Sequence, residues 1–264
     1  MRFHKYHALG NDYIVLNPRD GAIQLVPAQI QLICHRHYGI GSDGILLGPT
    51  PSTECDFGLR FFNPDGGEFE KSGNGLRIFS RYLWDEGLVQ NSPFTIMTPG
   101  GKVTSCVHTG GRIVSVDMGR VSFHSNRIPV TGPPRDVINE TITVAGQKLR
   151  FCAVTIGNPH CVVLREQTEP EQARMWGPLI ENDPRFPSRT NVQFLDVINC
   201  STIKIEIWER GVGYTLASGS SSCAAAAVAR RLGLCDSQVT VKMPGGVIDI
   251  TIDEDWSISM TGSV

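Results

Sequence analysis

Short landmarks in the first half of this chain return in the second half, in the same order. They are Leu9-Gly10-Asn11 and Ile156-Gly157-Asn158, Ser72-Gly73 and Ser218-Gly219, Gly87-Leu88 and Gly233-Leu234, Pro99-Gly100-Gly101 and Pro244-Gly245-Gly246, and Met118-Gly119 and Met260-Thr261-Gly262. The first four pairs are 145 to 147 residues apart and the fifth about 142. A solenoid repeat has roughly 20–50 residues. This single long repeat therefore predicts two similar domains that arose by internal duplication.

The repeat also predicts where one domain ends and the next begins. The strand with Met118-Gly119 closes the first copy, which gives domains at 1–119 and 120–257. Whether residues 258–264 return to the first domain stays open. A chain of 264 residues can bury a core in each of two such domains.

Each half is expected to contain strands, one central helix and further strands. Helices are predicted over 73–86 and 220–232, because a glycine follows each and suits the residue just past a helix end. Alternating apolar and polar residues at 203–207 and 247–252 predict half-buried strands. The sequence therefore indicates an α+β fold in which a helix packs against a curved mixed sheet.

Composition excludes several classes of function. The formal net charge is −2 and no basic block is present, so a nucleic-acid partner is not expected. No apolar run is long enough for a signal peptide or a membrane span, so we expect a cytoplasmic protein without a membrane partner. The eight cysteines form no C-x-x-C pair, which argues against zinc, and most are expected to be buried, reduced thiols.

The strongest local signals are the two helix starts, Ser72-Gly73-Asn74 and Ser218-Gly219-Ser220. The first N–H groups of a helix have no partner within the helix and carry partial positive charge, so they can bind an anion. Each serine alone is more simply explained as an N-cap. Because both occur at equivalent places in a duplicated chain, we interpret them as two halves of one site.

Polar residues precede both helix starts at the same distance. Asn63 lies nine residues before Ser72, and Glu209 lies nine residues before Ser218. Arg210 suits a carboxylate and Glu209 suits an ammonium group. A surface ion pair at a strand end is the simpler alternative for Glu209 and Arg210.

Together these stretches resemble the diaminopimelate epimerase family from end to end. The matching stretches are Leu9-Gly10-Asn11-Asp12-Tyr13, Gly39-Ile40-Gly41-Ser42-Asp43-Gly44, Phe62-Asn63-Pro64-Asp65-Gly66, Gly73-Asn74-Gly75-Leu76-Arg77, Gly157-Asn158-Pro159-His160-Cys161, Arg185-Phe186-Pro187 with Thr190-Asn191, Glu209-Arg210-Gly211-Val212-Gly213, and Pro244-Gly245-Gly246. The ordered set is highly specific, although no single stretch is.

The resemblance implies two similar domains, each a sheet wrapped around a central helix, with the active site in the cleft between them. It implies an isomerase of lysine biosynthesis that needs no cofactor and no metal, and that interconverts LL- and meso-diaminopimelate through a pair of cysteines. The implied substrate-binding residues are Asn11, Asn63, Gly73, Asn74, Asn158, His160, Asn191, Glu209, Arg210, Gly219 and Ser220. Of these, Asn63, Asn158, Asn191, Glu209 and Arg210 would hold the distal, unreacting end. Family members are often homodimers.

One departure from the family is large, because serine occupies both catalytic cysteine positions, Ser72 and Ser218. A thiol ionises near pH ~8.5, whereas a serine hydroxyl needs a partner base. His160 is the nearest candidate for such a base. The sequence therefore predicts binding with little or no epimerase activity. Engineered replacement and natural loss of the cysteines are both open as the origin, and the intact distal residues favour engineering.

Two alternatives remain at this point. A racemase of the same fold could act on another amino acid, but a one-ended substrate would leave Glu209 and Arg210 without partners, which is costly in a closed site. A non-catalytic amino-acid binding protein could use Ser72 and Ser218 as hydrogen-bonding groups, and this comes first if the serines are natural.

Overall fold

The computed structural model describes residues 2–21, 25–108 and 110–264. The chain folds into two compact units. Unit 1 contains residues 1–117 together with 261–264, and unit 2 contains residues 118–260. The chain therefore passes between units twice.

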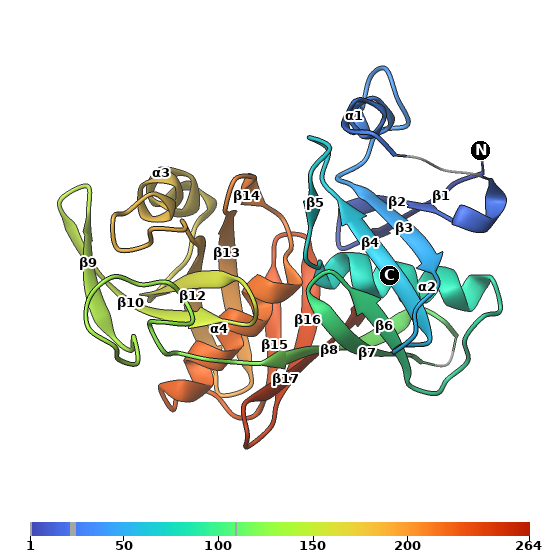
Figure 1. The fold of residues 1–264 in the computed structure, drawn as a ribbon. Helices are drawn as coiled ribbons and strands as arrows, with labels where there is room; N and C mark the ends of the chain where they lie inside the picture. Colours follow the sequence, from blue (N-terminus) through green and yellow to red (C-terminus); the bar gives the residue numbers. More distant parts are fainter. Residues whose placement is uncertain (1, 22–24, 109) are drawn as a thin grey trace. The chain divides into compact units, whose positions relative to one another are not determined.

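Among its described residues, unit 1 contains two α-helices, with strands before and after each (Figure 1). Its elements are β1 (His4–Ala8), β2 (Asn11–Leu16), the short 3-10 helix η1 (Pro18–Asp20), α1 (Pro27–Cys34), β3 (Ile45–Thr50), β4 (Phe57–Phe62), β5 (Glu68–Phe69), α2 (Gly73–Asp85), β6 (Phe94–Thr98), β7 (Gly101–Val107) and β8 (Ile113–Arg120). Strand β8 continues past residue 117 into unit 2.

Unit 2 contains the remaining elements. They are β9 (Glu140–Val144), β10 (Gln147–Thr155), β11 (Pro159–Arg165), α3 (Pro170–Glu181), β12 (Asn191–Asn199), β13 (Thr202–Glu209), β14 (Gly213–Thr215), α4 (Gly219–Arg231), β15 (Gln238–Met243), β16 (Gly246–Ile252) and β17 (Ser257–Ser263). The last residues of β17 belong to unit 1.

The two units repeat one order of strand pairing. In unit 1, β1 and β2 are antiparallel, β2 and β3 parallel, β3 and β4 antiparallel, β4 and β6 parallel, and β6 and β7 antiparallel. In unit 2, β10–β11, β11–β12, β12–β13, β13–β15 and β15–β16 follow the same alternation. The mixed sheets and the duplication predicted from the sequence are therefore confirmed.

Helices α2 and α4 are the equivalent central helices of the two units. Each ends as its glycine predicts: Gly87 has φ +69° and Gly233 has φ +71°, in the left-handed region that glycine tolerates. The next residue closes the end, since Leu88 N donates to Leu83 O at 2.9 Å and Leu234 N donates to Ala229 O at 2.9 Å. Both helices therefore end in the bonding pattern typical of a C-terminal glycine.

Burial explains the different composition of the two helices. In α2, the apolar residues Leu76, Phe79 and Leu83 are fully buried and its C-terminal end reaches the surface. In α4, every residue of the run 223–229 is 0% exposed, and the helix contacts strands β10 to β13, β15 and β16. A helix surrounded in this way needs small side chains on all faces, which explains its alanines.

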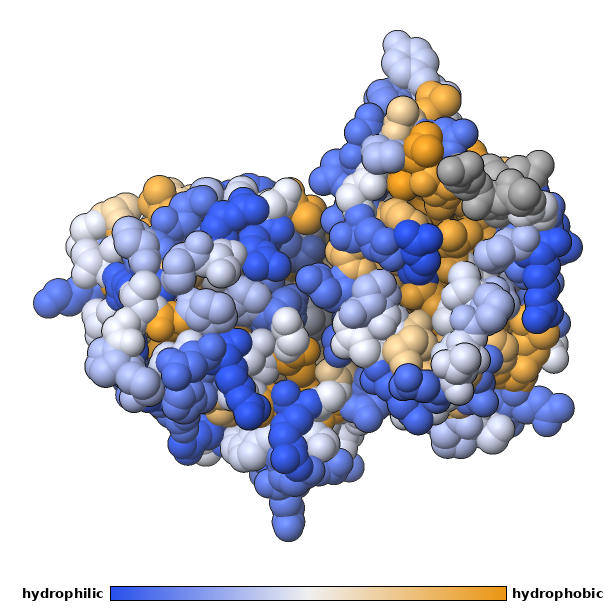
Figure 2. Space-filling view, viewed as in Figure 1, coloured by the Kyte–Doolittle hydropathy of each residue, from blue (hydrophilic) through white to orange (hydrophobic). Residues whose placement is uncertain are grey.

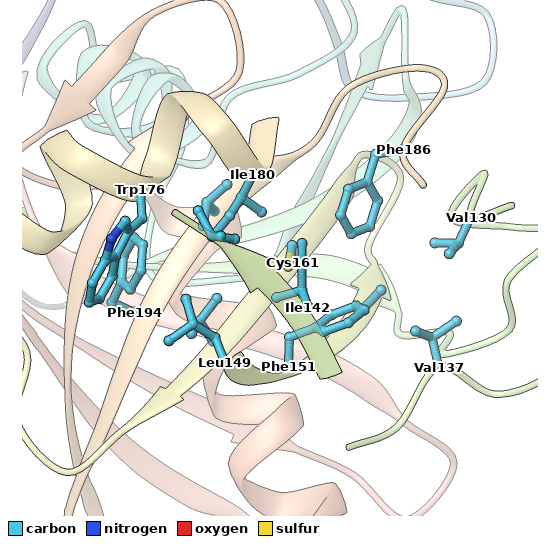
Figure 3. Packing of buried hydrophobic residues seen from close by; sticks show 14 of the residues in the cluster. Val130, Val137, Ile142, Leu149, Phe151, Cys161, Trp176, Ile180, Phe186 and Phe194 are labelled. Carbon is cyan, nitrogen blue, oxygen red and sulfur yellow. The ribbon is translucent and has the colours of Figure 1, made fainter. Parts of the chain in front are cut away.

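Helix α3 covers part of the unit 2 sheet, and a cluster of buried hydrophobic residues lies between them (Figure 3). Its side chains Trp176 and Ile180 pack there with strand residues that include Phe151 and Phe194. The helix approaches β13 closely, because a Cβ at Gly177 would lie 2.5 Å from Trp208 Cγ. Glycine at this position is therefore required by packing.

The prediction of a half-buried strand at 203–207 was wrong at one polar position, Glu206, while Lys204 on the same face is partly exposed as expected. Ile203, Ile205 and Ile207 are fully buried as expected, but Glu206 on the other face is also only 2% exposed. Helix α3 packs against this strand. Burial raises the pKa of Glu206, and the hydrogen bond from Tyr214 Oη at 2.7 Å opposes that shift. The alternating pattern could not reveal the helix that covers the polar side.

On the face drawn in Figure 2, hydrophobic residues gather on unit 1 beside helix α1, while the visible face of unit 2 is mostly hydrophilic. Helix α1 contributes Leu32, which is 58% exposed. Among the described residues, no helix has the length and apolar character needed to cross a membrane.

Candidate functional site

The two serines occupy equivalent positions in the two units. In unit 1 the order is β4, a tight turn, β5, Ser72 and α2; in unit 2 it is β13, a tight turn, β14, Ser218 and α4. Both serines have extended backbones, with φ −128° and ψ 128° for Ser72 and φ −148° and ψ 124° for Ser218. Gly73 and Gly219 are the first residues of the two helices and are buried. The predicted N-cap role of both serines is confirmed.

The hydroxyl of Ser72 has two neighbours in unit 1. Its Oγ accepts a hydrogen bond from Gly75 N at 3.1 Å, as an N-cap does. Tyr13 Oη donates to the same oxygen at 3.4 Å. A side chain larger than glycine at position 75 would be crowded, since its Cβ would lie 3.1 Å from Leu46 and Phe61 and 3.2 Å from Ser72 Cβ. The glycine thus permits the close approach of the helix start.

Asn74 links this helix start to Asn11. Asn74 is 3% exposed; its Nδ2 donates to Asn11 Oδ1 at 3.1 Å, and its Oδ1 accepts from Arg77 Nη2 at 2.9 Å. Asn11 Nδ2 in turn donates to Asp43 Oδ2 at 2.9 Å. The structure therefore brings together Asn11, Asn74 and the N-terminus of α2.

Ion pairs near the surface hold Asp43, to which the side chains of Asn74 and Asn11 are linked. Arg36 Nη2 contacts Asp12 Oδ1 at 2.8 Å and Asp43 Oδ1 at 2.6 Å, and Lys5 Nζ lies 3.0 Å from Asp12 Oδ2. Burial acts to raise the pKa of Asp12, but the hydrogen bonds from Arg36 and Lys5 outweigh it and lower that pKa to about 2. Asp12 is therefore ionised at neutral pH.

Asn63 begins the turn between β4 and β5. Its backbone N–H donates to Gly67 O at 2.8 Å and its carbonyl accepts from Gly66 N at 3.0 Å. The side chain is partly buried. We call Asn11, Asn63, Ser72, Gly73 and Asn74 the first half-site.

Ser218 in unit 2 is more deeply buried than Ser72, with 5% exposure. Its Oγ accepts from Ser221 N at 3.4 Å. The hydroxyl of Ser221 is held in turn by Gln193 Nε2 at 3.0 Å, and Gln193 is fully buried. A buried polar layer therefore lies under this helix start.

Asn158, His160 and Ser220 form a connected group in unit 2. Asn158 Nδ2 donates to Ser220 Oγ at 3.5 Å, and Asn158 Oδ1 lies 3.0 Å from His160 Nε2. Complete burial lowers the pKa of His160 to about 3, with the interaction with Gln193 acting in the opposite direction. The imidazole is neutral at pH 7, and because Asn158 Oδ1 can only accept, the ring proton lies on Nε2, which donates to it.

Asn191 connects this group to the turn after β13. His160 and Asn191 are partners in the parallel pairing of β11 with β12. Asn191 Oδ1 accepts from Arg210 N at 3.0 Å, and its Nδ2 donates to Pro159 O at 2.9 Å. Glu209 is the last residue of β13. We call Asn158, His160, Asn191, Glu209, Arg210, Ser218, Gly219 and Ser220 the second half-site.

Within its own unit, neither serine contacts an activating base. Among the described residues of each unit, Ser72 Oγ bonds to Gly75 N and Tyr13 and Ser218 Oγ bonds to Ser221 N, and neither bonds to a carboxylate, imidazole or amine of that unit. His160 contacts Asn158, and a group with a pKa of about 3 is a weak base. In residues 2–21, 25–108 and 110–264, no three His, Cys, Asp or Glu side chains gather as metal ligands would.

Sequence analysis did not single out three neighbours of these residues. Tyr13 bonds Ser72, Gln193 supports Ser221, and Glu181 holds the turn after β13. Tyr13 lies in a stretch that carries the family resemblance, so its position could have been noticed. Gln193 and Glu181 give no local signal, because only the pairing of strands and the packing of α3 bring them to the site.

Solved structures of known proteins share the fold. A hydroxyproline epimerase from Agrobacterium vitis superposes with a TM-score of 0.73 at 14% identity, covering 98% of this chain and 88% of that one. A phenazine biosynthesis protein from Bacillus anthracis gives a TM-score of 0.68 at 16% identity, covering 99% and 96%. At these identities the likeness shows only that the chain shares the fold of these proteins.

Sequence comparison is more specific. The diaminopimelate epimerase family model matches residues 3–124 and 152–264. Diaminopimelate epimerase 2 of Nostoc sp. (strain PCC 7120) is 62% identical over 264 residues, covering 100% of this chain and 93% of that relative. Diaminopimelate epimerase of Moorella thermoacetica is 37% identical, covering 99% and 95%. The chain belongs to the diaminopimelate epimerase family.

Proposed function

We propose that this chain is a diaminopimelate epimerase in scaffold and in ligand, whose proton-transfer activity is strongly reduced by serine at positions 72 and 218. The observation that carries the proposal is the pair of equivalent helix N-termini, each with a serine cap and neighbouring amides. Two relatives that are 62% and 37% identical are both named as diaminopimelate epimerases, and the match covers 93% and 95% of their length. The reaction concerned is the interconversion of LL- and meso-diaminopimelate in lysine biosynthesis.

In this proposal each half-site contributes to both ends of the ligand. The N-termini of α2 and α4 hold the α-carboxylate at the reacting carbon, since unpaired N–H groups and the helix dipole favour an anion there. The same groups stabilise negative charge that develops when the α-proton leaves. Asn63, Asn158, Asn191, Glu209 and Arg210 hold the distal amino-acid end. Asn11 and His160 complete the lining.

The chemistry of the serines limits the rate. Removing an α-proton requires a base, and a thiolate supplies one because a thiol ionises near pH ~8.5 before tuning. A serine hydroxyl with no partner base stays protonated. Residues 72 and 218 are the positions of the acid/base pair, and as serines they cap helices without exchanging protons efficiently. This reasoning applies equally to engineered and natural serines.

A second candidate is a non-catalytic amino-acid binding protein. The observation that favours it is that both serine hydroxyls are engaged as caps and that the buried imidazole of His160 has a pKa of about 3. This candidate shares the ligand with the first and differs only in whether restored thiols produce catalysis. From its membership of this family we also propose that the protein is cytoplasmic. On the same basis we propose that it forms a homodimer.

The test is α-proton exchange of LL-diaminopimelate in D₂O, followed by NMR. The chain as it stands is compared with the Ser72→Cys/Ser218→Cys variant. Exchange and meso product in the variant, with little in the parent chain, support the epimerase. Binding by both without exchange in either leaves the binding protein, and absence of binding by both contradicts both candidates.

A further inference from the structure

Glu181, the last residue of α3, is a buried carboxylate that the proposed function does not use. Its side chain is 6% exposed and accepts three hydrogen bonds. Arg189 Nη1 donates to Oε1 at 3.0 Å, Gly211 N donates to the same oxygen at 2.9 Å, and Trp208 Nε1 donates to Oε2 at 2.8 Å. Burying a carboxylate is costly unless its oxygens accept hydrogen bonds, and these three donors offset that cost.

These partners lie on two segments that carry distal-end residues. Trp208 and Gly211 flank Glu209 and Arg210, so Glu181 holds the turn from both sides. Val212 N donates to Glu209 O at 3.1 Å and Gly211 has φ +76°, which defines a tight turn with glycine at its left-handed position. The orientation of Glu209 and Arg210 therefore depends on how this turn is fixed.

Arg189 lies on the other segment, two residues before Asn191. It adopts φ +56°, which is unfavourable for a residue with a side chain. Such a backbone persists where surrounding contacts over-determine it. The bond to Glu181 is one such contact, and Arg189 N also donates to Phe186 O at 2.8 Å.

The two segments meet where Asn191 Oδ1 accepts from Arg210 N at 3.0 Å. We propose that Glu181 is a positioning residue that sets the geometry of Asn191, Glu209 and Arg210, and thereby the affinity for the distal amino-acid end of the ligand. It acts through the backbone of the turn and does not touch the ligand. This inference rests on the proposed function.

The test measures diaminopimelate binding by NMR titration for the parent chain and for Glu181→Gln, which keeps the shape and removes the charge. We expect the Kd to rise about tenfold, because a charged acceptor of three hydrogen bonds is replaced by a neutral amide. We also expect faster hydrogen exchange of the Gly211 and Val212 amides. The matched control is Glu206→Gln, since Glu206 is a buried carboxylate of the same unit whose hydrogen bond is with Tyr214. It should lower Tm with a Kd within about twofold of the parent's.

A double-mutant comparison separates positioning from general stability. In a Glu209→Gln/Arg210→Gln background, adding Glu181→Gln should change the Kd by less than about twofold, because two of the three side chains that it positions no longer carry the charges that bind the ligand. If Glu181→Gln does not fold, Arg189→Gln removes one partner only and should raise the Kd about threefold, since a half-exposed ion pair contributes less.

Two results would overturn the inference while the proposed function stands. One is a parent-like Kd for Glu181→Gln together with a lowered Tm. The other is an equal increase in Kd with and without Glu209 and Arg210. If the parent chain itself does not bind diaminopimelate, the proposed function fails, and the inference fails with it.

Discussion

The two half-sites share a backbone plan but are supported by different chemistry. Around Ser72, amide side chains lead outward from Asn74 through Asn11 to the ion pairs of Asp43 and Arg36 near the surface. Around Ser218, the support is buried and mostly neutral, and it contains His160 and Gln193 at 0% exposure. Duplication thus preserved the helix start and the turn before it, while the surroundings diverged. The electrostatic behaviour of equivalent positions therefore cannot be transferred from one unit to the other.

The largest expected effect comes from introducing one thiol at a time at the two proposed acid/base positions. Ser72→Cys and Ser218→Cys should each raise the α-proton exchange rate about 10²–10⁴-fold, the usual range for a positioned acid or base. Each single variant should exchange the proton of one ligand stereoisomer faster than that of the other, because each half-site would serve one face of the carbon. Exchange measured by NMR with pure LL- and meso-diaminopimelate checks this.

Equal exchange of both stereoisomers by both single variants would contradict that division of labour. Ser80→Cys is a control, because it adds a thiol to the buried part of α2, where Ser80 Oγ bonds Leu76 O and Ser105. It should leave the exchange rate at the level of the parent chain.

Acid should destabilise unit 2 before unit 1. The folded pKa of His160 is about 3, below its ordinary ~6.5, so the unfolded chain binds a proton that the folded unit does not. The corresponding stability is complete above pH ~6.5 and falls by about 3 kcal/mol between pH 7 and pH 4. The lowered pKa of Asp12, about 2, contributes stability to unit 1 that is lost only below the ordinary carboxyl pKa of ~3.9.

Hydrogen exchange of core amides in each unit at pH 7 and pH 4.5 measures the difference. His160→Gln removes the titrating group, and its unit 2 should lose less stability over the same interval. Parallel losses in both units above pH 5 would show that the burial of His160 does not control acid stability.

Truncating equivalent asparagines should have unequal costs. Asn158→Ala leaves the buried Nε2 of His160 without its acceptor, which should lower the free energy of unfolding by about 1–3 kcal/mol. Asn11→Ala also removes an acceptor, that of Asn74 Nδ2, but Asn11 itself is only partly buried, so that water can replace it, and the cost should be about 1 kcal/mol or less. Denaturant unfolding measures both, and the comparison fails if Asn11→Ala is the more damaging.

The smallest expected difference between the two units concerns the caps. Ser72→Ala and Ser218→Ala each remove an N-cap and should cost about 0.5–2 kcal/mol. The Ser72 bond to Gly75 N is shorter, at 3.1 Å against 3.4 Å for Ser218 to Ser221 N, and Tyr13 also bonds Ser72. Ser72→Ala should therefore have the larger cost within that range. Replacement by threonine, which retains a hydroxyl, should retain most of the stability in both units.

Much of the fold follows from local sequence. The glycines at 87 and 233 end helices as predicted, and both serines cap them, because these effects depend on residues within one helical turn. The burial of Glu206 on the polar face of β13 was missed, because a helix that begins more than thirty residues earlier in the chain packs against this strand. An alternating apolar and polar pattern predicts which face of a strand is buried in the core, but it does not show whether another element covers the polar face.

The candidate site shows the same limit. Asn11, Asn74, Asn158, His160, Asn191 and Arg210 could be named from motifs, and the structure joins them by hydrogen bonds or strand pairing within their units. Glu181 could not be named, since nothing in its own stretch distinguishes it from the other acidic residues on helix surfaces. Its three partners come from residues 189, 208 and 211, which only the folded unit brings to one carboxylate.

The sequence by itself therefore determined the duplication, the helix ends, the capping serines and the family, because repeats, caps and motifs are encoded by residues that are near one another. The tertiary structure alone decided which polar groups are buried and what they contact. The low pKa of His160 follows from complete burial beside β12, and the role of Glu181 from the packing of α3 against β13. Desolvation and long-range hydrogen bonds arise only when distant segments pack, so no local pattern can specify them.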